Sequence, residues 1–384
     1  MHKLKIAILS STNMNEFFTN GLYQNAYTLA LMLNNHPNFE VTMVDYRKIS
    51  PGNLGVIKTE NFDFLEKSDI LITVAKTPIE EDCVNLQKKG VKIISIKYGN
   101  NLNSDLSTFV SYNCGTKPFS MQAEWRKIRH KEYKPDLILY SPHYNFQSEY
   151  LAICNNVSSD KVLECPYVWS PVFIKAASVV GIKKGLEEYS FDFKKQDPKN
   201  KNIACVEPSI NFTKTNLVPI ITLQYLYQNN PHAFNAGYIF GSRNLMESQE
   251  SKDYFDYINE LSAFKDGKVT FEGRLRMPNI LAEKARVLFS HQKQNALNYT
   301  YLEYAYHHLP FVHNSDFLTN YGYYYFEDKL IEASEKLELA LNHDNLTSKE
   351  STIYNNSCDE MIWSYSPDNP KNISGYIDLI ERVL

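Results

Sequence analysis

The sequence predicts an α/β protein built from two Rossmann-like domains that face a central cleft. Its 384 residues exceed what one hydrophobic core usually serves, so two domains are expected. Short apolar segments alternate with helical segments in both halves, a pattern typical of parallel strands buried on both faces. Residues 165–171 contain two prolines and interrupt this alternation, which indicates a crossing between the two domains.

The first half contains five apolar segments that we expect to be strands, at residues 5–10, 39–46, 69–74, 91–97 and 136–140. Apolar residues recur at helical spacing within residues 21–34, and a second helix is expected at 80–89. These elements predict an N-terminal Rossmann-like domain over residues 1–165.

The second half repeats the pattern after a charged loop. Its expected strands are 203–206, 238–240, 269–271, 287–290 and 311–313, and its expected helices are 216–227, 253–264, 278–284, 299–307 and 330–342. They predict a C-terminal domain over residues 166–370. The final residues, 371–384, carry apolar positions at helical spacing, and this helix is expected either to pack on its own domain or to cross back to the first.

The bulk composition is that of an ordinary globular protein. A net charge of −4 gives no general attraction to nucleic acid or to an anionic membrane. The six cysteines form no Cys-x-x-Cys pair, so neither a zinc site nor a redox motif is indicated. No apolar run approaches the roughly 18 residues of a membrane span. We therefore expect a soluble protein of the cytoplasm, or of the host cytoplasm if it is viral, and the oligomeric state stays open.

One carboxylate stands out in the second half. Glu303 lies on an apolar, aromatic helix that follows a strand, close to the edge where doubly wound sheets bind ligands. A carboxylate there suits the paired hydroxyls of a ribose, because it accepts two hydrogen bonds. The alternative is a solvated glutamate on the helix surface.

Residues 269–316 resemble the nucleotide-sugar half of twin-Rossmann (GT-B) glycosyltransferases. The resemblance rests on the segment Phe271-Glu272-Gly273-Arg274, on Glu303 and on Pro310-Phe311-Val312. It implies that Gly273, Arg274 and Leu275 meet the base of the donor and that Glu303 binds its ribose. Further expected contacts to the nucleotide sugar are Asn298 and Tyr299, and also Asn295, which stands where the family often has a glutamate contacting the sugar.

The chain has two narrower resemblances as well. The whole chain is similar to an uncharacterised group of bacterial glycosyltransferase-like proteins, through residues 20–25, Glu207-Pro208, Lys214-Thr215 and His313-Asn314-Ser315. Residues 271–317 are also similar to the DNA β-glucosyltransferases of T-even phages. The catalytic aspartate of those enzymes follows the strand corresponding to residues 91–97. In this chain Gly99 stands at about that point, with Asp105 nearby.

Transfer from a nucleoside diphosphate sugar, with a UDP-sugar as the expected donor, leaves a diphosphate whose charge must be stabilised. The sequence has no Asp-x-Asp metal motif, so we expect neither a metal nor another cofactor. Lys214 follows a strand and precedes a helix, with Thr213 or Thr215 as the expected N-cap, which suits a phosphate; a solvated lysine is the alternative. The remaining donor candidates are Arg243, Arg274, Asn20 and Gly21.

An acceptor hydroxyl needs a base. Asp105 and His143 each follow a strand of the first domain and are the candidates, although a histidine there is also a common loop hydrogen-bonding residue. Residues 117–134 carry six lysines and arginines against two glutamates, interleaved with aromatic residues, a composition that suits nucleic acid but is also found on ordinary basic surfaces. The expected acceptor contacts are Trp125, Arg126, Lys127 and Arg129.

The leading prediction for the acceptor is a hydroxymethylated base in double-stranded phage DNA, held by residues 117–134. A glycan, lipid or protein hydroxyl is the next alternative. A nucleotide-sugar epimerase and a non-catalytic sugar-nucleotide binder remain as different classes of function on the same fold.

Overall fold

The computed structural model describes residues 3–10, 21–44, 58–60, 62–74, 76–113, 123–175, 200–209, 212–242 and 251–384. The chain divides into two compact units. Unit 1 consists of residues 1–176 and 363–384, and unit 2 of residues 177–362. The C-terminal segment therefore belongs to unit 1.

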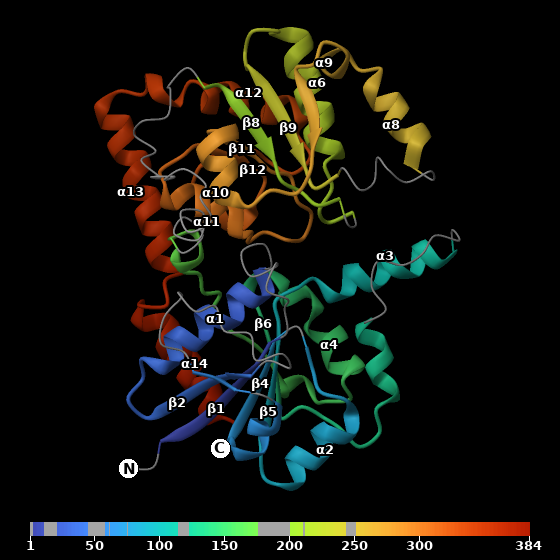
Figure 1. Cartoon of the computed structure of the whole chain (residues 1–384), viewed down its shortest axis with the longest axis vertical. Helices are drawn as coiled ribbons and strands as arrows, with labels where there is room; N and C mark the ends of the chain where they lie inside the picture. The colour runs from blue at the N-terminus through green and yellow to red at the C-terminus, as the bar shows by residue number, and fades with distance from the viewer. Residues whose placement is uncertain are drawn as a thin grey trace. The chain divides into compact units, whose positions relative to one another are not determined.

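Seven parallel strands form the sheet of unit 1 in the described part of the chain (Figure 1). They are β1 (Leu4–Leu9), β2 (Phe39–Val44), β3 (Lys58–Glu60), β4 (Ile70–Val74), β5 (Lys92–Lys97), β6 (Leu137–Tyr140) and β7 (Val162–Glu164). Their spatial order is β3-β2-β1-β4-β5-β6-β7. The chain thus reverses direction across the sheet between β1 and β4, which is the topological switch point of a doubly wound fold.

Helices cover both faces of this sheet because its strands are apolar on both sides. Ile6 and Ile8 pack with α1 (Gly21–Asn34) and α14 (Pro370–Glu381), whereas Ala7 and Leu9 pack with α2 (Glu80–Lys88). The other helical segments of unit 1 are η1 (Phe62–Lys67), α3 (Asn101–Asn113), η2 (Glu124–Arg129), η3 (Pro142–Gln147), α4 (Ser148–Cys154) and η4 (Ser159–Lys161).

The last helix, α14, is part of the core of unit 1. Tyr376 and Ile380 lie in the same apolar cluster as strand β1, and the hydroxyls of Tyr376 and Tyr98 are 2.9 Å apart. The chain therefore ends on the unit in which it began.

Unit 2 contains six parallel strands in its described residues. They are β8 (Asn202–Cys205), β9 (Ala236–Phe240), β10 (Val269–Glu272), β11 (Val287–Phe289), β12 (Phe311–His313) and β13 (Tyr323–Tyr324). Their order is β10-β9-β8-β11-β12-β13, which repeats the Rossmann order and places the switch point between β8 and β11.

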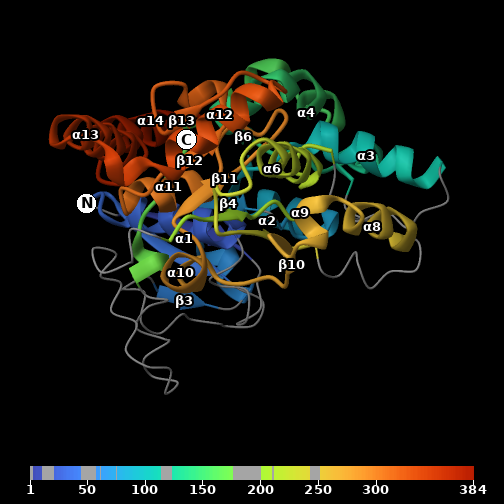
Figure 2. The same ribbon diagram turned by 90° about the horizontal axis from the view of Figure 1, so that it is seen from above.

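The helices of unit 2 pack on this sheet in the same manner. Leu223 of α6 (Leu217–Asn229) and Leu337 of α12 (Leu330–Leu341) share one apolar cluster with the strands. Figure 2 shows α9 (Ser262–Lys265) beside α6, where Gln224 donates to Ser262 over 2.8 Å. The other helical segments are α8 (Lys252–Asn259), α10 (Met277–Asn279), η7 (Ile280–Lys284), α11 (Tyr299–Tyr306), η8 (Asp316–Leu318), η9 (His343–Asn345) and α13 (Ser348–Ser364), the last reaching into the residues of unit 1.

The predicted α/β class with two Rossmann-like domains is confirmed, whereas several single elements differ. The helix expected at 253–264 is two helices, because Leu261 adopts extended φ and ψ between α8 and α9. The helix expected at 278–284 is one α-helical turn followed by the π-helix η7. Helix α3 was not expected, because its large apolar residues Leu106, Phe109 and Val110 are exposed and form no inward stripe.

Candidate functional site

The switch point of unit 2 holds a buried carboxylate. Glu207 lies two residues after β8, and Ser290 follows β11 directly. Ser290 donates its hydroxyl proton to Glu207 and lies 2.9 Å from the hydroxyl of Tyr301. The Glu207 side chain is 0% exposed, and burial raises its pKa while the charge of Lys214 opposes that rise. The side chain is thus taken out of water at the point where a doubly wound sheet binds ligands.

Gln292 connects Glu207 to two further loops. Its Nε2 donates to Oε1 and Oε2 of Glu207, each over 3.0 Å, and its Oε1 accepts from Asn295 Nδ2. Its backbone N–H donates to Asn314 Oδ1 over 3.0 Å, and its carbonyl accepts from Asn314 Nδ2 over 2.9 Å. One glutamine therefore joins the loops that follow β8, β11 and β12.

Lys214 lies against the same loop. Its backbone forms an isolated antiparallel bridge with Gln292, and the N–H of Lys293 donates to the carbonyl of Thr213 over 3.0 Å. Burial lowers the pKa of Lys214, and the charge of Glu207 opposes that shift. Within the described residues, no hydrogen bond or ion pair engages the Lys214 ammonium. This half-buried cation is available to an anion.

The helix after Lys214 begins later than the sequence suggested. The expected N-cap, Thr213 or Thr215, is wrong, because α6 begins at Leu217 with Asn216 at the N-cap. Thr215 nevertheless accepts a hydrogen bond from the N–H of Leu217 over 3.2 Å, as residues before a helix often do. The Asn216 side chain instead donates to Ser242 over 2.9 Å and so ties this turn to the end of β9.

Glu303 is a buried residue of α11. Asn298 caps this helix by accepting a hydrogen bond from the N–H of Thr300 over 3.4 Å, and Tyr299 is its first residue. The Glu303 side chain is 8% exposed, so it is not a solvated surface glutamate. Burial raises its pKa to about 8, and none of the described residues forms a hydrogen bond or ion pair with its carboxylate.

The segment expected to meet the donor base leaves the sheet at its edge. Residues Gly273, Arg274 and Leu275 follow β10 without regular secondary structure, and Arg274 and Leu275 are exposed. Asn295, in contrast, is almost fully buried, and its amide nitrogen already donates to Gln292. Asn295 therefore holds the loop after β11 in place.

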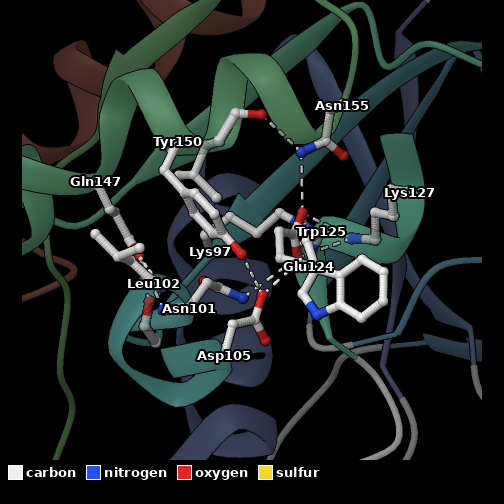
Figure 3. Close-up of polar contacts among 12 residues, drawn as sticks. Lys97, Asn101, Leu102, Asp105, Glu124, Trp125, Lys127, Gln147, Tyr150 and Asn155 are labelled. Atoms are coloured by element: carbon white, nitrogen blue, oxygen red, sulfur yellow. Dashed lines mark hydrogen bonds and ion pairs between the residues drawn. The ribbon is translucent and has the colours of Figure 1, made fainter. Parts of the chain in front are cut away.

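In unit 1, the Asp105 carboxylate is held by hydrogen bonds from neighbouring residues (Figure 3). Its Oδ2 accepts from the backbone N–H of Trp125 over 3.2 Å and from the hydroxyl of Tyr150 over 2.5 Å. Burial raises the pKa of Asp105, and these hydrogen bonds oppose that rise. The carboxylate thus joins α3 to η2 and α4.

Residues 117–134, which we call the basic segment, contain a buried acid next to Asp105. Glu124 Oε1 lies 3.0 Å from Lys97 Nζ and 2.9 Å from Lys127 Nζ, and it accepts from Asn155 Nδ2 over 2.9 Å (Figure 3). Burial acts to raise the pKa of Glu124, but the two lysines outweigh it and hold the pKa at about 2. Lys127 is therefore already engaged inside unit 1.

The other expected acceptor residues lie at the surface. Trp125 and Arg129 are exposed, and the guanidinium carbon of Arg126 lies 5.8 Å from the Trp125 ring centroid. Arg129 lines an open hollow beside α2 with Glu80 and Lys131.

His143 is buried rather than presented to solvent. It lies in η3 and its ring centroid is 3.9 Å from that of Tyr144. Gly21 is the first residue of α1, and Asn20, Arg243 and Lys117 lie outside the described residues. No group of three or more His, Cys, Asp or Glu that suits a metal ion occurs among the residues with described positions.

The chain matches one family model over residues 5–380. That family is DUF2827, described as proteins of unknown function. The chain belongs to this family. No curated protein sequence matches it.

Solved structures with the same fold cover the whole chain. A glycosyltransferase from Rickettsia africae is 11% identical over 99% of this chain and 100% of its own, with a TM-score of 0.55. Anabaena HepE, solved with UDP-glucose, is 10% identical over 98% and 99%, with a TM-score of 0.56. The N-terminal domain of the trehalose-6-phosphate phosphatase of Candida albicans is 12% identical over 100% and 98%, with a TM-score of 0.58.

These likenesses show the fold, which is that of the twin-Rossmann (GT-B) glycosyltransferases. The resemblance to phage DNA glucosyltransferases stays a prediction. In the part of the chain that the structure describes, every helix is too short or too polar to cross a bilayer.

Proposed function

We propose that this protein transfers a sugar from a nucleoside diphosphate sugar, with a UDP-sugar as donor, to an acceptor hydroxyl. The observation that carries the proposal is Glu303, a buried carboxylate with no protein partner among the described residues, in the unit that also holds the half-buried Lys214. A buried acid without a partner is costly to a folded protein, which favours a role in ligand binding.

In this proposal the ribose of the donor binds Glu303. Its two hydroxyls donate to the two carboxylate oxygens, which replaces the water that burial removes. Because hydrogen bonds of this kind stabilise the ionised form, nucleotide binding lowers the pKa of Glu303 from about 8. Gly273, Arg274 and Leu275 then meet the base through the backbone after β10.

The diphosphate of the donor binds Lys214. An ammonium without an internal partner can stabilise the charge that develops on the leaving diphosphate. Arg274 and Arg243 are further candidates for the same task, with Asn20 and Gly21 on the first unit. That HepE was solved with UDP-glucose supports a uridine nucleotide. The metal-independent course remains part of the proposal.

Unit 1 supplies the acceptor side. Asp105 is the better candidate for the base, because its carboxylate is held in a fixed position by Trp125 and Tyr150 at the carboxyl edge of the sheet. His143, packed against aromatic rings, is the second candidate. The leading acceptor is a hydroxymethylated base in DNA, bound by Trp125 and the exposed cations of the basic segment.

A donor and acceptor screen tests this function. The protein is incubated with UDP-sugars and, in parallel, with hydroxymethylcytosine DNA, plain DNA or no acceptor. We expect sugar incorporation into hydroxymethylcytosine DNA alone. If sugar is incorporated into neither DNA but is transferred to a glycan, lipid or protein, the proposed transferase activity is supported and DNA is excluded as its acceptor.

The same screen separates the other classes of function. An epimerase converts the UDP-sugar with no acceptor present, whereas a non-catalytic binder leaves the donor unchanged although it binds UDP. Either result would contradict the transferase.

A further inference from the structure

We propose that Glu207 and Gln292 form a positioning pair that fixes the diphosphate-binding part of the nucleotide site in unit 2. The inference rests on the proposed function, because it assigns Lys214 to the diphosphate. Glu207 and Gln292 are 0% and 6% exposed and lie at the switch point between β8 and β11. Neither was singled out as a site residue from the sequence.

The hydrogen bonds of Gln292 hold its side chain in a single rotamer. Both oxygens of Glu207 accept from its Nε2, and its Oε1 accepts from Asn295. Its backbone N–H and carbonyl are both paired with the side chain of Asn314. A buried network in which each member is satisfied is rigid, because any other rotamer leaves a buried polar atom without a partner.

This network also sets the position of Lys214. The Lys214 backbone is bridged to Gln292, and the neighbouring residues Thr213 and Lys293 share a hydrogen bond of 3.0 Å. Glu207 attracts the Lys214 ammonium electrostatically, although the two form no ion pair within 4.0 Å. The carboxylate therefore opposes the loss of charge that burial favours at Lys214, and it leaves the ammonium N–H groups to a ligand.

A positioning role and a general role in folding predict different effects on the affinities for UDP and for uridine. Uridine contains the base and the ribose, which are assigned to Gly273 to Leu275 and to Glu303. UDP adds the diphosphate, which is assigned to Lys214. Loss of the Glu207 charge should therefore weaken the binding of UDP and leave the binding of uridine nearly unchanged.

The experiment compares UDP, by titration calorimetry, with uridine, by ligand-observed NMR, on the full chain. We expect Glu207→Gln to weaken UDP about tenfold and to change uridine binding less than about twofold. The double variant Glu207→Gln with Gln292→Glu restores both a carboxylate and its amide donor at this place, so it should regain most of the UDP affinity. Glu335→Gln, an exposed glutamate of α12, is the matched control and should change neither.

Equal losses of affinity for UDP and uridine, or no loss of UDP affinity, would overturn the positioning role of the pair. The proposed nucleotide site would be unaffected by either result. If the wild-type chain binds no UDP, the proposed function fails and the inference fails with it. Should Glu207→Gln not fold, as judged by circular dichroism, Asn314→Ala takes its place. This variant removes the hydrogen bonds to the Gln292 backbone, together with a longer one of 3.4 Å to the Glu327 carbonyl, and should weaken UDP binding about threefold. Unchanged UDP affinity would count against the pair.

Discussion

Asp105 and Glu124 of unit 1 and Glu303 of unit 2 are all buried acids, but their surroundings differ. In unit 1, Asp105 and Glu124 are surrounded by donors and cations, so the fold itself satisfies them. In unit 2, Glu303 is buried without a partner in the described residues, and the Lys214 ammonium is unpaired there as well. Burial alone does not distinguish the two groups; the presence of internal partners does. Glu303 and Lys214 are therefore the residues whose missing partners a ligand would supply.

The largest effect is expected from breaking the buried ion pair of unit 1. Lys97→Met removes one of the two lysines that contact the Glu124 carboxylate and should lower the free energy of unfolding by about 3 kcal/mol, measured by urea denaturation. The control is Lys89→Met, which removes an exposed pair with Glu66 and should cost less than about 1 kcal/mol. Equal effects of the two variants would mean that burial does not strengthen this pair.

Removing the Glu303 charge should act on the ligand. Glu303→Gln should weaken UDP at least about tenfold, because hydrogen bonds to a charged group contribute roughly 1.5–3 kcal/mol. Unlike Glu207→Gln, this variant should weaken uridine as well. Calorimetry and ligand-observed NMR measure the two affinities. An unchanged uridine affinity would contradict the assignment of the ribose to Glu303.

The same variant should stabilise the free protein in a pH-dependent way. Burial raises the pKa of Glu303 from its ordinary value of 4.5 to about 8 in the folded chain, so folding favours the protonated form. The stability that this residue contributes is present below pH 4.5 and is lost as the pH rises toward 8. Glu303→Gln should therefore gain stability over the wild type across that range, in thermal unfolding without nucleotide. A constant difference at all pH values would contradict the unpartnered carboxylate.

The smallest effect is expected at Asp105. Tyr150→Phe removes one of its hydrogen bonds and should cost roughly 1–2 kcal/mol of stability. If Asp105 is the base, the pH at which transfer reaches half of its maximum should shift upward in this variant, because a lost hydrogen bond raises the pKa of the carboxyl. A loss of stability with an unchanged pH profile would assign Asp105 to the fold alone.

The alternation of apolar segments predicted the two Rossmann-like units, because strands buried on both faces leave an uninterrupted apolar pattern. The motif around Glu303 also placed that residue on a helix after β11, as the structure has it. The pattern missed α3, whose apolar side chains face outward. It also missed Gln292, because an amide in a polar loop gives no periodic signal, and only the folded loops show that it joins three of them.

A crystal structure with bound UDP tests the central claim most directly. The account predicts both ribose hydroxyls within about 3 Å of the Glu303 carboxylate and the diphosphate at the Lys214 ammonium. UDP bound with its ribose away from Glu303, and with the carboxylate still without a partner, would contradict it.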